Sequence, residues 1–95
     1  MLVRVKAILD LAAVLGAREV WLEVPTGATV ATALDLLVQK YGAPLAEKLF
    51  EPESRQLRPY IRLVLNNRDL FLPQGLETVL NEQDTLLLLP PAGGG

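Results

Sequence analysis

The chain has 95 residues, 51% of them hydrophobic, and its nine Lys and Arg residues against eleven Asp and Glu residues give a formal net charge of −2. This length fits one domain with a single core and excludes a multidomain enzyme. The basic residues are spread along the chain, and no apolar run approaches the roughly 20 residues needed to span a bilayer. We therefore expect no nucleic-acid or membrane partner and, without a signal-peptide pattern at the N-terminus, a cytoplasmic location.

Cys and His are both absent from the sequence. It therefore offers no disulfide, no zinc site of the usual kind, no thiolate nucleophile and no imidazole base. The single serine, Ser54, would need an unusually placed Lys or carboxylate to act as a nucleophile. These absences predict a protein with no autonomous catalytic site, no metal and no permanently bound cofactor.

The first third of the chain alternates between apolar and polar residues in two runs, at residues 3–7 and 19–24. A period of two is typical of half-buried strands. Between them, Leu11–Leu15 is an apolar segment closed by Gly16, which we interpret as a turn. The two runs are predicted to form a hairpin with an enlarged loop.

In the middle of the chain the period changes to that of a helix. Thr29 is suited to cap its start and Gly42 to end it. Pro44 suits the first turn of a second, shorter helix, and residues 51–54 are typical of a turn. The apolar residues at helical spacing are Val30, Ala33, Leu34, Leu37, Val38 and Tyr41.

The last third returns to strands. A strand is expected at residues 60–65, followed by a tight turn at Asn66–Asn67, because Asn tolerates positive φ better than most residues. A short strand at 69–72, an irregular or 3₁₀ segment at 76–80 and a final strand at 84–89 complete the chain. This order predicts an α+β fold, a mixed sheet with one main helix packed on one face, which is the β-grasp layout of ubiquitin. The domain is expected to span residues 1–91.

The final strand contains Leu86, Leu87, Leu88 and Leu89, with no polar residue on either face. A helix covers only one side of a two-layer sheet, so apolar residues on the other side indicate a partner. The alternative is a central strand that loops partly cover. Only a contiguous exposed patch would decide between the two.

Residues 92–95 are predicted to form a flexible tail after Pro90 and Pro91, which stiffen the chain and end sheet pairing because they lack N–H groups. Three terminal glycines have no side chains and would pass through a narrow channel to present a carboxylate. A carboxylate reacts readily only after activation, most simply as a mixed anhydride with AMP. The sequence has no phosphate-binding motif, so the protein would be the substrate of an ATP-using enzyme. A frayed terminus is the alternative.

Three segments together resemble the MoaD/ThiS family of ubiquitin-like sulfur carriers. They are Leu65–Asp69, Gly75–Asp84 and Leu88–Gly95. In the family the corresponding segments look like Val-Asn-Gly-Arg-Asp, Gly-Leu-x-Thr-x-Leu-x-x-Gly-Asp and Phe-Pro-Pro-Val-Ala-Gly-Gly. The pattern is most similar to the small subunit of molybdopterin synthase. Asn67 and Gln83 stand where the family often has Gly, and we expect the Gln83 turn to differ in shape because Gln at positive φ is strained.

The resemblance implies a cycle at Gly95. A partner adenylating enzyme would activate its carboxylate with ATP and Mg²⁺, a sulfur donor would replace AMP, and the thiocarboxylate would supply sulfur for molybdopterin biosynthesis inside the large subunit of molybdopterin synthase. The residues expected to thread the active site or set the reach of the tail are Pro90, Pro91, Ala92, Gly93 and Gly94. The residues expected to bind the partner are Arg62, Phe71, Leu86, Leu87, Leu88 and Leu89.

Three other functions share this fold. A sulfur carrier for thiamine or tRNA thiolation would use the same terminal chemistry with a different acceptor. A ubiquitin-like modifier would pass Gly95 to a lysine of another protein. A plain interaction module would use its sheet surface alone, and its activity would survive loss of Gly94 and Gly95.

Overall fold

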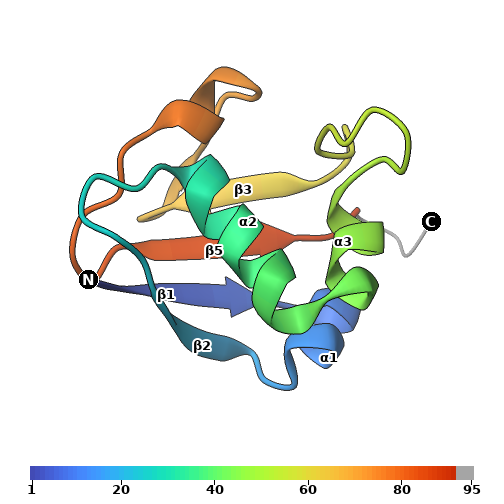
Figure 1. Ribbon diagram of the computed structural model, residues 1–95, viewed down its shortest axis with the longest axis horizontal. Helices are drawn as coiled ribbons and strands as arrows, with labels where there is room; N and C mark the ends of the chain where they lie inside the picture. Colours follow the sequence, from blue (N-terminus) through green and yellow to red (C-terminus); the bar gives the residue numbers. More distant parts are fainter. Residues whose placement is uncertain (92–95) are drawn as a thin grey trace.

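The computed structural model describes residues 1–91, in which alternating apolar residues of four strands build one face of a five-stranded sheet (Figure 1). The helices lie against that face and enclose the core. In chain order the elements are β1 (Leu2–Ala7), α1 (Leu9–Leu15), β2 (Glu19–Glu23), α2 (Val30–Tyr41), α3 (Ala43–Leu49), β3 (Arg62–Leu65), β4 (Arg68–Asp69), the 3₁₀ helix η1 (Gln74–Glu77) and β5 (Thr85–Leu89).

The sheet is mixed, with the strand order β2-β1-β5-β3-β4. The first and last strands are parallel neighbours at its centre, where Val5 lies opposite Leu86. The other pairs are antiparallel, including β3 and β5, where Leu63 lies opposite Leu88. This arrangement confirms the predicted α+β fold with the ubiquitin-like β-grasp layout.

Helix α2 crosses the sheet and supplies the other half of the core (Figure 1). The Thr29 hydroxyl accepts a hydrogen bond from the Thr32 N–H at 3.2 Å, and the Gly42 N–H donates to the Val38 carbonyl at 2.7 Å. Both predicted caps are therefore confirmed. Among residues 1–91, no helix is both long and apolar enough to cross a membrane. The apolar residues of α2 that are buried are Val30, Ala33, Leu34 and Leu37.

The segment expected to be an apolar turn is instead the short helix α1, so that prediction was wrong. Leu11 and Leu15, one helical turn apart, are both buried. Gly16 adopts a φ of 78° and its N–H donates to the carbonyls of Ala12 and Ala13, which ends the helix. The connection between β1 and β2 thus becomes a packed helix that covers one end of the sheet (Figure 1).

The strand expected at residues 69–72 is shorter than predicted, because β4 contains only Arg68 and Asp69. The Leu70 N–H still donates to the Leu63 carbonyl at 2.9 Å. The next carbonyl, that of Phe71, accepts a hydrogen bond from the Gly75 N–H at 2.6 Å, and this bond turns the chain into η1. A local turn therefore replaces the second half of the expected strand.

Two turns lead into or lie beside β5. Asn66 and Asn67 have φ values of 50° and 70°, which confirms the tight turn. Gln83 also adopts a positive φ, 67°, the conformation that was expected to be strained for Gln. The Gln83 N–H donates to the Leu2 carbonyl, while the buried Asp84 carboxylate accepts the Asn81 N–H at 2.7 Å and the Asn66 side-chain amide at 2.8 Å. These hydrogen bonds offset the strain at Gln83.

Candidate functional site

Strand β5 separates its leucines between two faces. Leu86 and Leu88 are 0% exposed and belong to the core, whereas Leu87 and Leu89 are half-buried on the opposite face. Leu86 and Leu88 therefore cannot form a docking surface, and that part of the partner-binding prediction was wrong. The physical reason is the pleat of a strand, which sends successive side chains to opposite faces.

The sheet face away from α2 carries an apolar patch, here called the outer patch. It contains Leu87 and Leu89 of β5 with Val64 of β3, and Val64 lies opposite Leu87 in the strand register. Next to it, Arg62 makes a two-pronged ion pair with Asp69, with Nη2 at 2.8 and 2.9 Å from the two carboxylate oxygens. Both side chains of this ion pair are 62% exposed, and Arg62 lies opposite Leu89 in the strand register.

Phe71 lies two residues after β4, where the chain turns toward η1. The side chain is 80% exposed, more than any other large apolar side chain in the described residues. The structure thus brings Arg62, Leu87 and Leu89 together on one sheet face. Phe71 is open to solvent, and its place in a docking surface stays a prediction.

The other half of the same sheet face is charged and aromatic. The guanidinium of Arg4 lies 4.8 Å from the centre of the Trp21 ring, a cation–π arrangement. Glu19 lies 3.7 Å from Arg4 and 3.9 Å from Lys6. The partner-binding prediction did not include Trp21. Its position between Glu19 and Glu23 in the alternation of β2 was the signal that this aromatic ring faces outward.

The base of the predicted tail lies at the end of β5. Leu89 pairs with Arg62, and Pro90 and Pro91 follow it, both partly exposed. Neither proline has an N–H to continue the sheet. Residues 92–95, which include the predicted site residues Ala92, Gly93, Gly94 and Gly95, lie outside the described residues. Their roles stay predictions.

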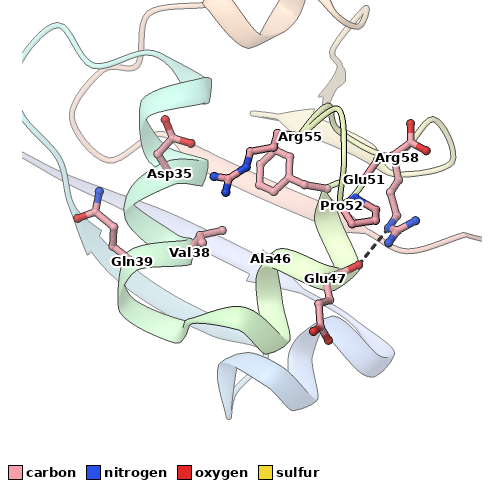
Figure 2. Close-up of a pocket in the computed structure, with 10 residues that line it drawn as sticks. Asp35, Val38, Gln39, Ala46, Glu47, Glu51, Pro52, Arg55 and Arg58 are labelled. Carbon is pink, nitrogen blue, oxygen red and sulfur yellow. Dashed lines mark hydrogen bonds between the residues drawn. The ribbon is translucent and has the colours of Figure 1, made fainter.

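A separate groove of about 840 Å³ lies on the helical side of the sheet, between α2 and the loop that follows α3 (Figure 2). In Figure 2, Arg55 reaches toward Asp35 on α2, while Arg58 is turned toward α3, where its Nε donates to the Glu47 carbonyl at 3.0 Å. Both charge signs line the groove. Within residues 1–91, no group of three or more acidic side chains is placed to hold a metal ion.

The domain has an exposed sheet face and a predicted tail that follows its last strand. The comparison of the chain with known protein families agrees with these two features. The sequence profile of the ThiS family matches residues 10–95. The chain belongs to the ThiS family. ThiS-family proteins of this group are ubiquitin-like sulfur carriers and modifiers. The matched range includes the predicted tail as well as the domain.

Two relatives of this ThiS-family chain come from Haloferax volcanii. Small archaeal modifier protein 3 is 29% identical over 82 residues, which cover 86% of each protein. The crystal structure of small archaeal modifier protein 1 is 32% identical, covers 100% of both chains and superimposes with a TM-score of 0.85. The second of these matches, a superposition over both whole chains, confirms the ubiquitin-like fold.

Two further structures bear on the kind of partner. A CysO chain from Amycolatopsis orientalis, solved as a BexX/CysO complex, is 30% identical, with coverage of 98% and 99% and a TM-score of 0.73. A putative molybdopterin converting factor subunit 1 from Pyrococcus furiosus is 21% identical, with coverage of 96% and 98% and a TM-score of 0.73. At that identity the second likeness shows the fold alone. The CysO chain was thus solved together with a partner protein, BexX. The molybdopterin role is taken up under the proposed function.

Proposed function

We propose that this ThiS-family protein is a sulfur carrier whose reactive group is the carboxylate of Gly95. The observation that carries the proposal is the family match, which runs from residue 10 through residue 95 and so includes the glycine tail. The domain itself has neither Cys nor His. A partner enzyme would therefore supply the catalytic groups, and we expect both proteins in the cytoplasm.

The chemistry at Gly95 has two steps. In the first, a carboxylate oxygen attacks the α-phosphorus of ATP, with Mg²⁺ on the phosphates, and pyrophosphate leaves to give an acyl adenylate. In the second, a donor at the oxidation level of sulfide attacks the carbonyl carbon and AMP leaves, which gives the thiocarboxylate. The mixed anhydride supplies the leaving group that a free carboxylate lacks, and no oxidant or reductant is required.

In this proposal the domain binds the partner enzyme and the tail carries the reactive group. Pro90 and Pro91 end the pairing of β5, so the chain leaves the sheet beside the outer patch. The apolar area of Leu87, Leu89 and Phe71 would bind the adenylating enzyme, and Arg62, held by Asp69, would orient the approach. The side-chain-free glycines would then enter the active site.

For the final acceptor we propose sulfur delivery for molybdopterin biosynthesis, with the large subunit of molybdopterin synthase as partner. The Pro-Pro before the tail supports this branch. A second candidate is conjugation of Gly95 to protein lysines, because the two Haloferax volcanii relatives are named as modifiers. Conjugates that persist after boiling in denaturant would favour the second candidate over the first.

Deletion of Gly95 tests the tail mechanism. The variant ends one residue short, so its carboxylate falls up to about 3.5 Å from the position of the native one, enough to abolish an in-line attack. We expect ATP–pyrophosphate exchange with the cognate adenylating enzyme to fall at least about a hundredfold, while the unfolding temperature stays within about 1 °C. A fully active Gly95 deletion would contradict the mechanism.

A further inference from the structure

Three large apolar side chains stand exposed around the base of the tail. Ile8 is 41% exposed, Leu9 70% and Tyr60 48%. They come from parts of the chain that are distant in sequence, the junction of β1 with α1 and the residues before β3. Clustered exposed apolar side chains in a small soluble domain mark an interaction surface, whereas single ones need no explanation.

The sheet register brings these residues to the same end as Pro91. β1 runs parallel to β5 with Ala7 opposite Leu88, so Ile8 and Leu9 emerge beside the end of β5. β3 runs antiparallel to β5 with Arg62 opposite Leu89, so the residues that precede β3, Tyr60 among them, lie at this end too. Figure 1 shows α1, the start of β3 and the end of β5 at one end of the molecule.

The backbone of Leu9 is strained where the chain turns from β1 into α1. Its φ is 53°, in the left-handed region, which costs a residue with a Cβ roughly 1–2 kcal/mol. The side chain is 70% exposed, so the packing of Leu9 itself does not offset that cost. Strain that persists at an exposed position points to a functional contact.

Helix α1 holds Leu9 in place. Leu11 and Leu15 anchor the helix in the core, and the Lys48 ammonium binds the Asp10 carboxylate at 3.0 Å, which ties α1 to α3. The charges next to Leu9 are therefore paired with each other. What remains for a partner at this position is apolar area, displayed on a support that is ordered before binding.

The length of the tail limits how far the partner can stand from this surface. Four residues follow Pro91, and a fully extended chain of four residues spans at most about 14 Å. The catalytic atoms that reach Gly95 must lie within that distance of Pro91. If an enzyme cleft takes in the tail to that depth, the entrance of the cleft must contact the end of the domain.

We propose that Ile8, Leu9 and Tyr60 form an apolar collar that docks against an apolar rim around the tail-receiving cleft of the adenylating enzyme. The inference rests on the proposed function, because it assumes that Gly95 is activated in trans. It adds a second contact at the end of the sheet, next to Leu89 of the outer patch. The collar would position the tail in the cleft, and the outer patch would supply the broader contact.

The test is the double variant Leu9→Asn with Tyr60→Ser, assayed by ATP–pyrophosphate exchange over a range of carrier concentrations. Asn accepts the left-handed conformation more readily than Leu, so the domain is expected to fold at least as well around residue 9. The half-saturating concentration is expected to rise about tenfold or more, with the maximal rate within about twofold of wild type. Leu9→Met should retain wild-type affinity, because it keeps the apolar area.

Val79→Thr is the matched control. Val79 is 54% exposed, like the collar residues, but it bridges to Thr29 before α2, away from the end of β5. Its half-saturating concentration should match that of wild type. A folded double variant with unchanged half-saturation, beside an active wild type, would overturn the collar and leave the proposed function standing. Failure of wild type and all variants with an adenylating enzyme that is active on its own carrier would overturn both.

Discussion

The two faces of β5 carry the same residue type but differ in surroundings. Leu86 and Leu88 are fully buried in the core, while Leu87 and Leu89 are half-buried on the opposite face of the sheet. Within residues 1–91, the labelled helices lie on one side of the sheet (Figure 1). The first pair contributes to the free energy of folding, and the second pair is available to a partner. The contrast teaches that the pleat position of a leucine, rather than its hydrophobicity, determines which role it has.

The largest expected effect is on stability, from a substitution on the inner face of β5. Leu88→Ala removes three carbons from a side chain that is 0% exposed, which leaves a cavity between the sheet and the helices. We expect the free energy of unfolding in urea to fall by about 2–5 kcal/mol. Exchange activity should persist below the unfolding transition. A loss of less than about 1 kcal/mol would break the contrast between the two faces.

A substitution on the outer face of β5 should weaken binding to the partner and leave stability nearly unchanged. Leu87→Thr keeps a strand-favouring residue while it removes apolar area from the outer patch. We expect the free energy of unfolding to change by about 1 kcal/mol or less, and the half-saturating concentration in ATP–pyrophosphate exchange to rise about tenfold. Leu88→Ala is its matched control, one residue along the strand. Equal losses of stability in the two variants would contradict the assignment.

The smallest effect is expected at the turn that leads into β5. Gln83→Gly relieves a left-handed conformation that costs roughly 1–2 kcal/mol, but it adds about 0.5–1 kcal/mol of chain entropy to the unfolded state. The net gain in unfolding free energy should lie between zero and about 1.5 kcal/mol, with exchange activity unchanged. Chemical denaturation of the two proteins side by side measures the difference. A destabilised Gly variant would show that the Gln83 side chain contributes more than its backbone costs.

Much of the fold could be predicted because its signals are local. Thr29 and Gly42 mark the ends of α2, and Asn66 and Asn67 mark a turn that requires positive φ. Helix α1 was missed because Leu11–Leu15 is apolar throughout, so no polar face reveals the helical period. The early end of β4 was missed because it depends on a main-chain hydrogen bond of Phe71, which leaves no trace in the hydrophobic pattern.

Some residues of the candidate site could likewise be predicted from the sequence, and others could not. The order of residues at the end of the chain predicts Gly95 as the reactive position through its resemblance to a family. A run of four leucines has no period, so it predicts a sheet strand without telling which two side chains face outward. The collar could not be found in the sequence, because the parallel pairing of β1 with β5 is what brings Leu9 to the end of the sheet near Tyr60.

The most direct test of a reactive tail on a docking domain is intact-mass spectrometry after incubation with the adenylating enzyme, ATP, Mg²⁺ and sulfide, followed by alkylation and fragmentation. The alkylation step is needed because oxidation of Met1 nearly equals the mass change from oxygen to sulfur. The chain contains no Cys, so an alkyl group marks a thiocarboxylate. Our account predicts one ATP-dependent alkyl group located on Gly95. An unlabelled Gly95 in the presence of an enzyme proven active on its own carrier would contradict it.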